Sequence, residues 1–503
     1  MSNWKDRVGA AAAALGVALL AVLPPQPAPA QIPTLGDSSD MTSTTERKLG
    51  ERIARELYRD PDYLDDAVLD EYVHGIWSRL LAAARARGEL TAELDERFAW
   101  QVLLGKDRSI NAFALPGGWL GLHLGLINVT ASRDEVASVL AHELSHVTQR
   151  HISRLMTQEK RQAPWVIGAM ILGAIAASKN PEAANALVTG GQALAMQNQL
   201  NFSRDMEREA DRIGYGVLTQ AGFQPQGFVA MFEKLQQASR LNDNGSFPYL
   251  RTHPMTTERM ADMQSRQQLV ARTAPAGPDL VHAMMVGRAR VLSNPGVDTL
   301  RSYVNDGQAL AAAKPATARD VTAVYAAALA AANLRDFTAA GRLAAKLPAL
   351  VAGDAEAARL AGLLASEIAL RAGDPSRALA LPEAGARRPE LLLSARAGIE
   401  RGRAAQVADR LQTWVALHPR DAQAWQLLAS AYAAQGQSMR SIRAEAEAQV
   451  AHLDYQAALD RFKAAQEVAR RGAPGRGDHI EASIIDTRAR QVESLLREQS
   501  LER

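Results

Sequence analysis

Two histidines stand four residues apart in the run His142-Glu143-Leu144-Ser145-His146. Residues at this spacing share one face of an α-helix, so both imidazoles can bind a single metal ion. Glu143 is offset by one position, which places its carboxylate beside the ion as a general base toward water. The pattern predicts a helix here and metal-dependent hydrolysis as its chemistry, with a third ligand coming from elsewhere in the chain.

The neighbouring residues support that helix. Ser132 and Glu135 have the spacing of a capping box at its start. Apolar residues then recur on one side, at Val136, Val139, Leu140 and Leu144. The alternative is a surface helix that carries two exposed histidines, but an amphipathic helix with a buried side favours the metal site.

The composition limits which residue types can bind the metal. The chain has 503 residues and no cysteine, which excludes zinc–sulfur sites and thiol nucleophiles. Any metal must be held by histidines and carboxylates, a ligand set that favours Zn²⁺. A formal net charge of +2, without a dense basic cluster, gives no indication of a nucleic-acid partner. The length predicts two or three domains.

The third ligand is expected from the segment 203–214, about 60 residues downstream of the first two. Glu207 and Asp211 are four residues apart and share a helix face. Glu207 can bind the metal while Asp211 accepts a hydrogen bond from a ligand imidazole. Glu209 competes as a ligand but projects from roughly the opposite face. The helix is expected to run to Gly222.

The run from His142 to His146, followed by Glu207-Arg-Glu-Ala-Asp211, resembles the HExxH…ExxxD signature of the gluzincin metallopeptidases related to the CAAX prenyl protease and HtpX. Residues 111–118 match that family too. The resemblance implies one Zn²⁺ per chain with Glu207 as its third ligand. Prenyl proteases and HtpX span the membrane several times, whereas this sequence lacks their flanking membrane segments.

Three further histidines need interpretation. In the exported branch of this family, a histidine after the third ligand caps the zinc and holds the enzyme latent, and His253 in the run 251–259 matches that histidine. The alternative is a loop histidine that packs beside a proline. His151 is expected to face away from His146 and to interact with water, and His123 is expected to be structural.

The N-terminus resembles an export signal. Residues 1–30 contain a short basic region, an apolar run and the small residues Ala28-Pro29-Ala30, which together predict a cleaved signal peptide and a periplasmic protein. The alternative is a short membrane anchor, although the apolar run is shorter than the roughly 20 residues of a spanning helix. Residues 31–45 are polar and predict a disordered leader.

A change in composition near residue 275 predicts a domain boundary. We expect an α+β zincin-like metallopeptidase domain over 46–275, followed by an all-α TPR-like helical repeat domain over 278–503. Trp425-x-x-Leu428-Ala-x-x-Tyr432 has the spacing of the first helix of a tetratricopeptide repeat (TPR). An irregular Ala-rich helical bundle is the alternative.

Residues 97–128 form the one clear β region, in which the run 116–118 (Pro-Gly-Gly) predicts a hairpin turn. An extended polypeptide substrate could add as a strand to an exposed edge formed by Asn111, Ala112, Phe113 and Ala114. Such binding suits unfolded polypeptides better than one peptide sequence. The apolar segment 164–177 is expected to be a buried or lid helix, and peripheral membrane contact is the alternative.

The resemblance also implies a function. It predicts a zinc-dependent endopeptidase that degrades misfolded or misassembled outer-membrane proteins and assists their assembly. Its expected partner is the outer-membrane β-barrel assembly machinery, bound through the TPR-like domain. The alternative is a chaperone or adaptor that acts mainly through residues 278–503 and whose protease site is largely silent. A metal-dependent hydrolase of another bond is a third hypothesis, less consistent with the HExxH motif.

Overall fold

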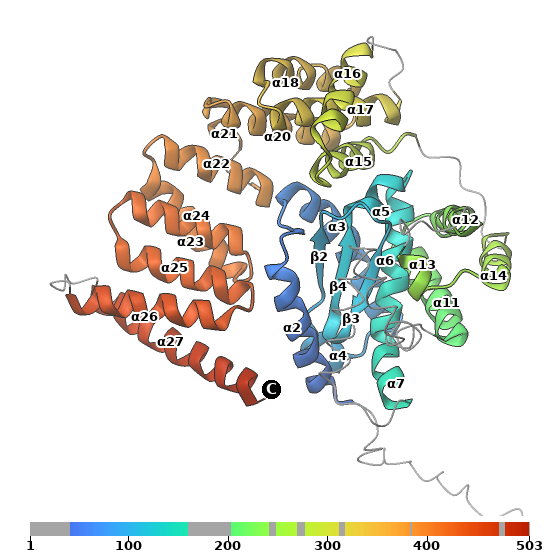
Figure 1. The fold of residues 1–503 in the computed structure, drawn as a ribbon, viewed down its shortest axis with the longest axis horizontal. Helices are drawn as coiled ribbons and strands as arrows, with labels where there is room; N and C mark the ends of the chain where they lie inside the picture. The colour runs from blue at the N-terminus through green and yellow to red at the C-terminus, as the bar shows by residue number, and fades with distance from the viewer. Residues whose placement is uncertain are drawn as a thin grey trace, which may run out of the picture. The chain divides into compact units, whose positions relative to one another are not determined.

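A four-stranded sheet forms the centre of the N-terminal half (Figure 1). The computed structural model describes residues 41–158, 203–240, 248–268, 277–310, 317–382, 385–471 and 478–501; the predicted signal peptide and the segment 164–177 lie outside them. The strands are β1 (Tyr63–Leu64), β2 (Gln101–Gly105), β3 (Ala112–Leu115) and β4 (Trp119–His123). Their order is β1-β2-β4-β3, so β3 lies at one edge of the sheet.

The predicted hairpin is confirmed. β3 and β4 are antiparallel and are joined by the 3-10 turn η1 (Pro116–Gly118), whereas β2 lies parallel to β4 on its other side. Gly117 has φ 72°, a left-handed conformation that favours glycine. A Cβ atom at this position would also lie 2.6 Å from the Cα of Arg47, so the turn requires glycine twice over.

Helices cover both faces of the sheet, so consecutive residues of β2 and β4 are buried instead of alternating with exposed ones. On one face, Leu103, Leu115 and Trp119 pack against α2 (Ser43–Arg59). On the other face, Val102, Leu104 and Leu120 belong to the main core with α3 (Ala67–Ala86) and α6 (Arg133–Thr148). This second face therefore carries the helix with the His-Glu-Leu-Ser-His run.

Further helices surround α6: α4 (Ala92–Arg97), α5 (Leu124–Val129), α7 (His151–Gln158), α11 (Arg204–Gln220), α12 (Gln226–Arg240), α13 (Tyr249–Thr252) and α14 (Thr257–Gln268). Of these, α11 approaches α6 most closely. A Cβ atom on Gly214 would lie 3.1 Å from the backbone of Ala141, which is tight for a larger residue. This close approach brings the carboxylates of α11 to the histidines of α6.

Two local predictions need correction. Thr42 caps α2, which begins at Ser43, so the last three residues of the expected leader 31–45 are helical. The capping box at the start of α6 is only half formed: the Ser132 hydroxyl accepts from the N–H of Glu135, but the Glu135 carboxylate accepts from the N–H of Ala131 instead. It also pairs with Lys234 at 2.6 Å, because the carboxylate is buried and needs a cation.

The C-terminal half is a run of packed helices. They are α15 (Leu280–Leu292), α16 (Val297–Ala309), α17 (Ala318–Asn333), α18 (Phe337–Ala344), α19 (Leu347–Leu350), α20 (Ala355–Arg371), α21 (Ser376–Leu379), α22 (Arg388–Glu400), α23 (Ala404–Leu417), α24 (Ala422–Ala434), α25 (Ser438–Ala451), α26 (Tyr455–Arg471) and α27 (Asp478–Leu501). The fold class is thus a mixed α/β domain with a small sheet, followed by a repeat-like helical domain. Within the described ranges, no helix combines the length and apolar character needed to cross a membrane.

The hydrophobic core does not divide at residue 278. Residues of α15, α17 and α20, such as Met284, Leu329 and Leu364, share one cluster with the helices of the α/β domain. By contrast, α22–α25 and α25–α27 build two smaller clusters of their own. The helices up to α20 are therefore part of the packing that supports the α/β domain.

Candidate metal centre

Three elements bring four potential metal ligands together. His142 and His146 lie one turn apart on α6, Glu207 lies on α11, and His253 directly follows α13. The Nε2 atoms of the two α6 histidines are 3.0 Å apart. Glu207 places Oε2 3.5 Å from Nε2 of His142 and Oε1 3.4 Å from Nε2 of His146. One ligand atom from each of the four residues lies within 4.8 Å of the others, and all four side chains are buried.

Glu143 lies beside this cluster, as the offset of one residue predicts. Its side chain is fully buried, and no hydrogen bond of ordinary geometry reaches its oxygens from the described residues, although the Tyr249 side chain is near enough to lower its pKa. Its closest charged neighbour is His253, whose Nε2 is 3.5 Å from Oε1. A buried carboxylate without a partner is costly, which is expected of a group kept for proton transfer rather than for stability.

Asp211 lies behind His142. Its Oδ1 is 2.9 Å from Nδ1 of His142, on the side of the ring that faces away from the cluster. Arg259 on α14 forms a fork with the same carboxylate, at 2.6 Å and 2.8 Å. The same guanidinium reaches Oε2 of Glu207 at 2.7 Å and the carbonyl oxygen of Pro254 at 2.9 Å. One arginine thus ties together the two carboxylates of α11 and the loop that follows His253.

The electrostatics set the protonation of each side chain in the metal-free cluster. Burial alone would raise the pKa of Glu207. The charge of His253 and hydrogen bonds from the imidazoles outweigh burial and hold this pKa well below its usual value. Burial holds the pKa of His146 well below 6.5, so this ring is neutral. Burial would also lower the pKa of His142, yet the Asp211 and Glu207 carboxylates raise it to about 10. The cluster therefore stabilises a positive charge between these groups.

These side chains fit a bound metal ion. Two imidazole nitrogens and a carboxylate converge on one point, and nitrogens as close as 3.0 Å need a cation or a proton between them. The ligand set contains no sulfur, and His/His/Glu ligation suits Zn²⁺. Within the described residues, this is the only group of three or more such side chains close enough to hold a metal.

Glu209, the competing candidate, lies outside the cluster. Its Oε2 is 3.1 Å from Nε2 of His151 and 2.8 Å from Nη1 of Arg154. The prediction for His151 was wrong. This side chain is fully buried, and its Nδ1 lies 2.9 Å from Nδ1 of His146. The prediction assumed a continuous helix, but α6 ends at Thr148 and Arg150 has φ 53°, so the chain bends back beneath His146.

His253 fills the space in front of the α6 histidines. Its Nδ1 is 2.9 Å from Oε1 of Glu207 and 3.4 Å from Nε2 of His142. The Tyr249 ring stacks on it, with centroids 4.5 Å apart and planes at 24°. The N–H of Tyr249 also donates to the carbonyl oxygen of Ile110 at 3.5 Å, just before β3. The short helix α13, which His253 follows, is thus attached beside the edge strand.

The expected substrate edge is only partly accessible. β3 is the edge strand, but Asn111 and Ala112 are buried, whereas Phe113 and Ala114 are partly exposed. Its closeness to α6 is consistent with the prediction of an edge near the metal.

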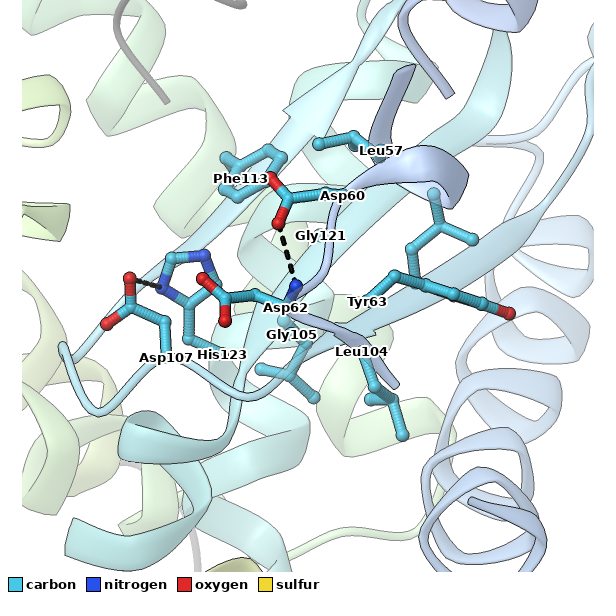
Figure 2. A pocket seen from close by; sticks show the side chains of 12 residues that line it. Leu57, Asp60, Asp62, Tyr63, Leu104, Gly105, Asp107, Phe113, Gly121 and His123 are labelled. Carbon is cyan, nitrogen blue, oxygen red and sulfur yellow. Dashed lines mark hydrogen bonds and ion pairs between the residues drawn. The ribbon is translucent and has the colours of Figure 1, made fainter. Parts of the chain in front are cut away.

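Apart from the metal cluster, a small cavity of about 30 Å³ lies between β1, β2 and the loop after β2 (Figure 2). Asp60, Asp62 and Asp107 line it together with His123 and Phe113. His123 is buried and within 2.9 Å of the Ser109 hydroxyl, and its 3.9 Å separation from Asp107 is too long for a hydrogen bond. The space holds about one water molecule. His123 is therefore accounted for by packing and hydrogen bonding, as predicted.

Sequence reasoning missed two residues of the centre. Arg259 ends the run 251–259, but nothing in the sequence indicated that it would contact the carboxylates. No sequence pattern indicated a role for Tyr249. A buried carboxylate pair such as Glu207 and Asp211 requires a cation, so a search for an arginine near them could have found Arg259.

Comparison with known proteins finds a family profile over the part of the chain that holds this centre. The profile of peptidase family M48 matches residues 69–267. A second profile, described as a bacterial transcriptional activator domain, matches residues 389–449, which fall on helices α22–α25.

Individual relatives match about half of the chain or less. The beta-barrel assembly-enhancing protease of Yersinia pestis is 34% identical over 278 residues, and that of Escherichia coli strain K12 is 34% identical over 241 residues. The mitochondrial metalloendopeptidase OMA1 of Arabidopsis thaliana is 29% identical over 218 residues. These matches cover 54%, 47% and 42% of this chain and 54%, 47% and 41% of the three relatives, so the chain spans about half their length or less.

Proposed function

We propose that this chain, whose residues 69–267 match the profile of peptidase family M48, is a zinc-dependent endopeptidase of the periplasm. The observation that carries the proposal is the buried cluster of His142, His146 and Glu207, with Glu143 beside it. The predicted signal peptide, residues 1–30, supports the location, although it lies outside the described residues.

The mechanism assigns a role to each side chain. His142, His146 and Glu207 would hold one Zn²⁺, which supplies Lewis-acid activation of water and of the scissile carbonyl when bound. Burial raises the pKa of Glu143, which makes its carboxylate a better proton acceptor than one in water. Glu143 takes a proton from the attacking water and delivers it to the leaving amine. Asp211 holds the His142 ring through Nδ1, with Arg259 fixing the carboxylate.

The substrates we propose are misfolded or misassembled outer-membrane proteins. Relatives named beta-barrel assembly-enhancing proteases support this class, because they are 34% identical to this chain over 241 and 278 residues. An unfolded segment would bind along the edge strand at residues 111–114, where backbone hydrogen bonds tolerate many sequences. The outer-membrane β-barrel assembly machinery would bind the TPR-like domain over 278–503, and peripheral membrane contact through 164–177 remains a proposal for a segment outside the described residues.

We further propose that His253 keeps the resting site closed. It is buried between Glu207 and Glu143 and occupies the space in front of the metal ligands. Tyr249 stacks on it and donates its backbone N–H to Ile110, just before β3, so the same short helix would also obstruct the substrate edge. Opening of this helix would expose the metal and the edge strand together.

We therefore expect His253→Ala to hydrolyse casein faster than the wild type. If the open state is populated to about 10% or less in the wild type, removing the cap raises the rate by about 10-fold or more. Casein cleavage and zinc content of the purified variants provide the measurement. His418→Ala, which removes an exposed histidine on α23's C-terminal side, is the matched control and should leave the rate unchanged. An unchanged rate in a zinc-loaded His253→Ala protein would contradict the capping role.

A chaperone or adaptor is the second candidate. The closed cluster and the long helical domain favour it, because a capped site cleaves little and packed helix pairs offer a binding surface. The two readings predict different results when the distal helices are removed. A cut at residue 278 would expose the shared core on α15, so a chain ending at residue 382 is the better test.

We expect the chain that ends at residue 382 to cleave casein at the wild-type rate but to lose its effect on outer-membrane protein assembly in cells. The helices removed, α22–α27, have their own hydrophobic clusters, so the peptidase core stays packed. Far-ultraviolet circular dichroism and casein cleavage check the fold, and outer-membrane protein levels check the docking role. Full assembly activity in cells without these helices would overturn the proposed docking through this part of the chain.

A further inference from the structure

We propose that His151 and Glu209 are positioning residues that hold His146 in the orientation and tautomer needed to bind the metal. The inference rests on the proposed metal site but concerns two residues outside it. His151 places Nδ1 2.9 Å from Nδ1 of His146, and its Nε2 lies 3.1 Å from Oε2 of Glu209. The two rings stand almost perpendicular, with planes at 76° and centroids 4.9 Å apart.

The direction of this hydrogen-bond chain follows from its last member. A carboxylate only accepts, so Nε2 of His151 must donate to Glu209. A neutral His151 then has a lone pair on Nδ1, which accepts from Nδ1 of His146. The His146 proton is therefore fixed on Nδ1, and the lone pair of its Nε2 points at Glu207, 3.4 Å away. This is the tautomer that can bind a metal through Nε2.

The backbone is built to place His151 there. In a continuous helix, a residue five positions on would be rotated by about 140° and would face away from His146. Instead, α6 ends at Thr148, and Arg150 adopts a left-handed conformation that is uncommon for a side chain of its size. Arg150 is held by the Glu46 carboxylate at 3.0 Å and the Ser153 hydroxyl at 3.2 Å. These contacts stabilise the bend that returns His151 to the cluster.

The arrangement parallels the support of His142. That ring has Nδ1 beside Asp211, and Arg259 lies behind the carboxylate. His146 has Nδ1 beside His151, then Glu209, and Arg154 behind the carboxylate. Asp211 is 1% exposed, whereas the Glu209 side chain is 29% exposed. We therefore expect the contribution of Glu209 to be smaller than that of His151.

A purely structural histidine would give the same packing, so the test must read the tautomer and the metal affinity. Full-length protein is prepared as His151→Ala, His151→Gln, Glu209→Gln and Glu209→Ala, with Asp205→Asn as the control. Asp205 is an exposed carboxylate of the same helix, paired with Arg208 instead of a histidine. Zinc dissociation constants come from competition with a chromophoric chelator, and the thermal midpoint of each zinc-free protein reports on folding.

We expect His151→Ala to raise the zinc dissociation constant by about 10- to 100-fold, the usual effect of removing a partner of a metal ligand. His151→Gln should recover part of the affinity, because its amide oxygen can accept from His146 and its amide group can donate to Glu209. Glu209→Gln should weaken binding more than Glu209→Ala, since a glutamine can donate to His151 and reverse the whole chain. Asp205→Asn should change nothing.

Nitrogen-15 spectra of the histidine rings in the zinc-free protein complete the test. The wild type should show His146 with its proton on Nδ1, and Glu209→Gln should move that proton toward Nε2. The proposal is overturned if the zinc-free wild type has the proton on Nε2, or if neither His151→Ala nor Glu209→Gln changes the zinc dissociation constant. A wild type that binds no zinc would refute the proposed function instead, and the tautomer measurement would still test this inference.

Discussion

Replacing Glu143 with Gln is expected to reduce peptide hydrolysis by about 10²- to 10⁴-fold, the range that positioned general acid–base groups contribute, while the protein keeps its zinc. Glutamine has nearly the shape of glutamate but cannot take a proton from water. Glu143 is not one of the converging ligands, so its removal leaves His142, His146 and Glu207 in place. The measurement is casein cleavage with metal content determined on the same sample.

The thermal unfolding midpoint of Glu143→Gln distinguishes a loss of catalysis from misfolding of the variant. Burial raises the pKa of Glu143, and the Tyr249 side chain opposes this only weakly, since no hydrogen bond of ordinary geometry reaches the Glu143 oxygens from the described residues. A neutral amide therefore costs no more to bury than the carboxylate, and Glu143→Gln should unfold at or above the wild-type midpoint.

His146→Ala is the contrasting variant. It removes a ligand, so both zinc and activity should be lost, whereas Glu143→Gln loses activity alone. The combined variant Glu143→Gln/His253→Ala should also be inactive, because opening the cap does not restore a base. Appreciable cleavage by zinc-loaded Glu143→Gln would contradict its role as the general base.

The sequence was most informative where chemistry depends on local spacing. His142, Glu143 and His146 are placed by the period of one helix, and Glu207 and Asp211 by the period of another. Both helices are present, and the structure brings their polar residues together. The turn at Gly117 was predictable for the same reason, because its left-handed conformation is a local requirement.

Prediction failed where the chain departs from a regular helix or where distant elements meet. The bend at Arg150 depends on Glu46, which lies 104 residues away and gives no local signal. Arg259 meets Asp211 across 48 residues through the packing of α14 against α11. The sequence also did not predict that α15 shares a hydrophobic core with the α/β domain. The change in composition near residue 275 marks the change from α/β to all-helical structure, but the hydrophobic core continues across it.

Arg259 carries the second large expected effect. Its guanidinium is 3% exposed and contacts Asp211 twice, Glu207 once and the Pro254 carbonyl. Arg259 pairs with both carboxylates and is always charged, whereas the charge of the neighbouring histidines depends on their protonation. Removing one partner of a buried ion pair leaves the other charge uncompensated and typically costs about 3–5 kcal/mol.

We therefore expect Arg259→Leu to lower the free energy of unfolding of the zinc-free protein by about 3–5 kcal/mol, measured by urea denaturation. Arg259→Lys should be intermediate, because an ammonium group keeps the charge but cannot form the fork to Asp211. Arg208→Leu is the matched control: this arginine on α11 is exposed and pairs with Asp205 and Glu258, so its loss should destabilise the protein far less than the loss of Arg259.

A second substitution shows whether charge is the cause. If Arg259→Leu destabilises the protein because it strands Asp211, then adding Asp211→Asn should recover part of the lost stability, and the double-mutant cycle should give a large coupling. If the loss comes only from missing apolar contact with Phe232, whose ring centroid lies 5.1 Å from the guanidinium, the two effects should add. Additive effects, or a cost for Arg259→Leu no larger than that for Arg208→Leu, would show that this buried arginine does not organise the carboxylates of the metal centre.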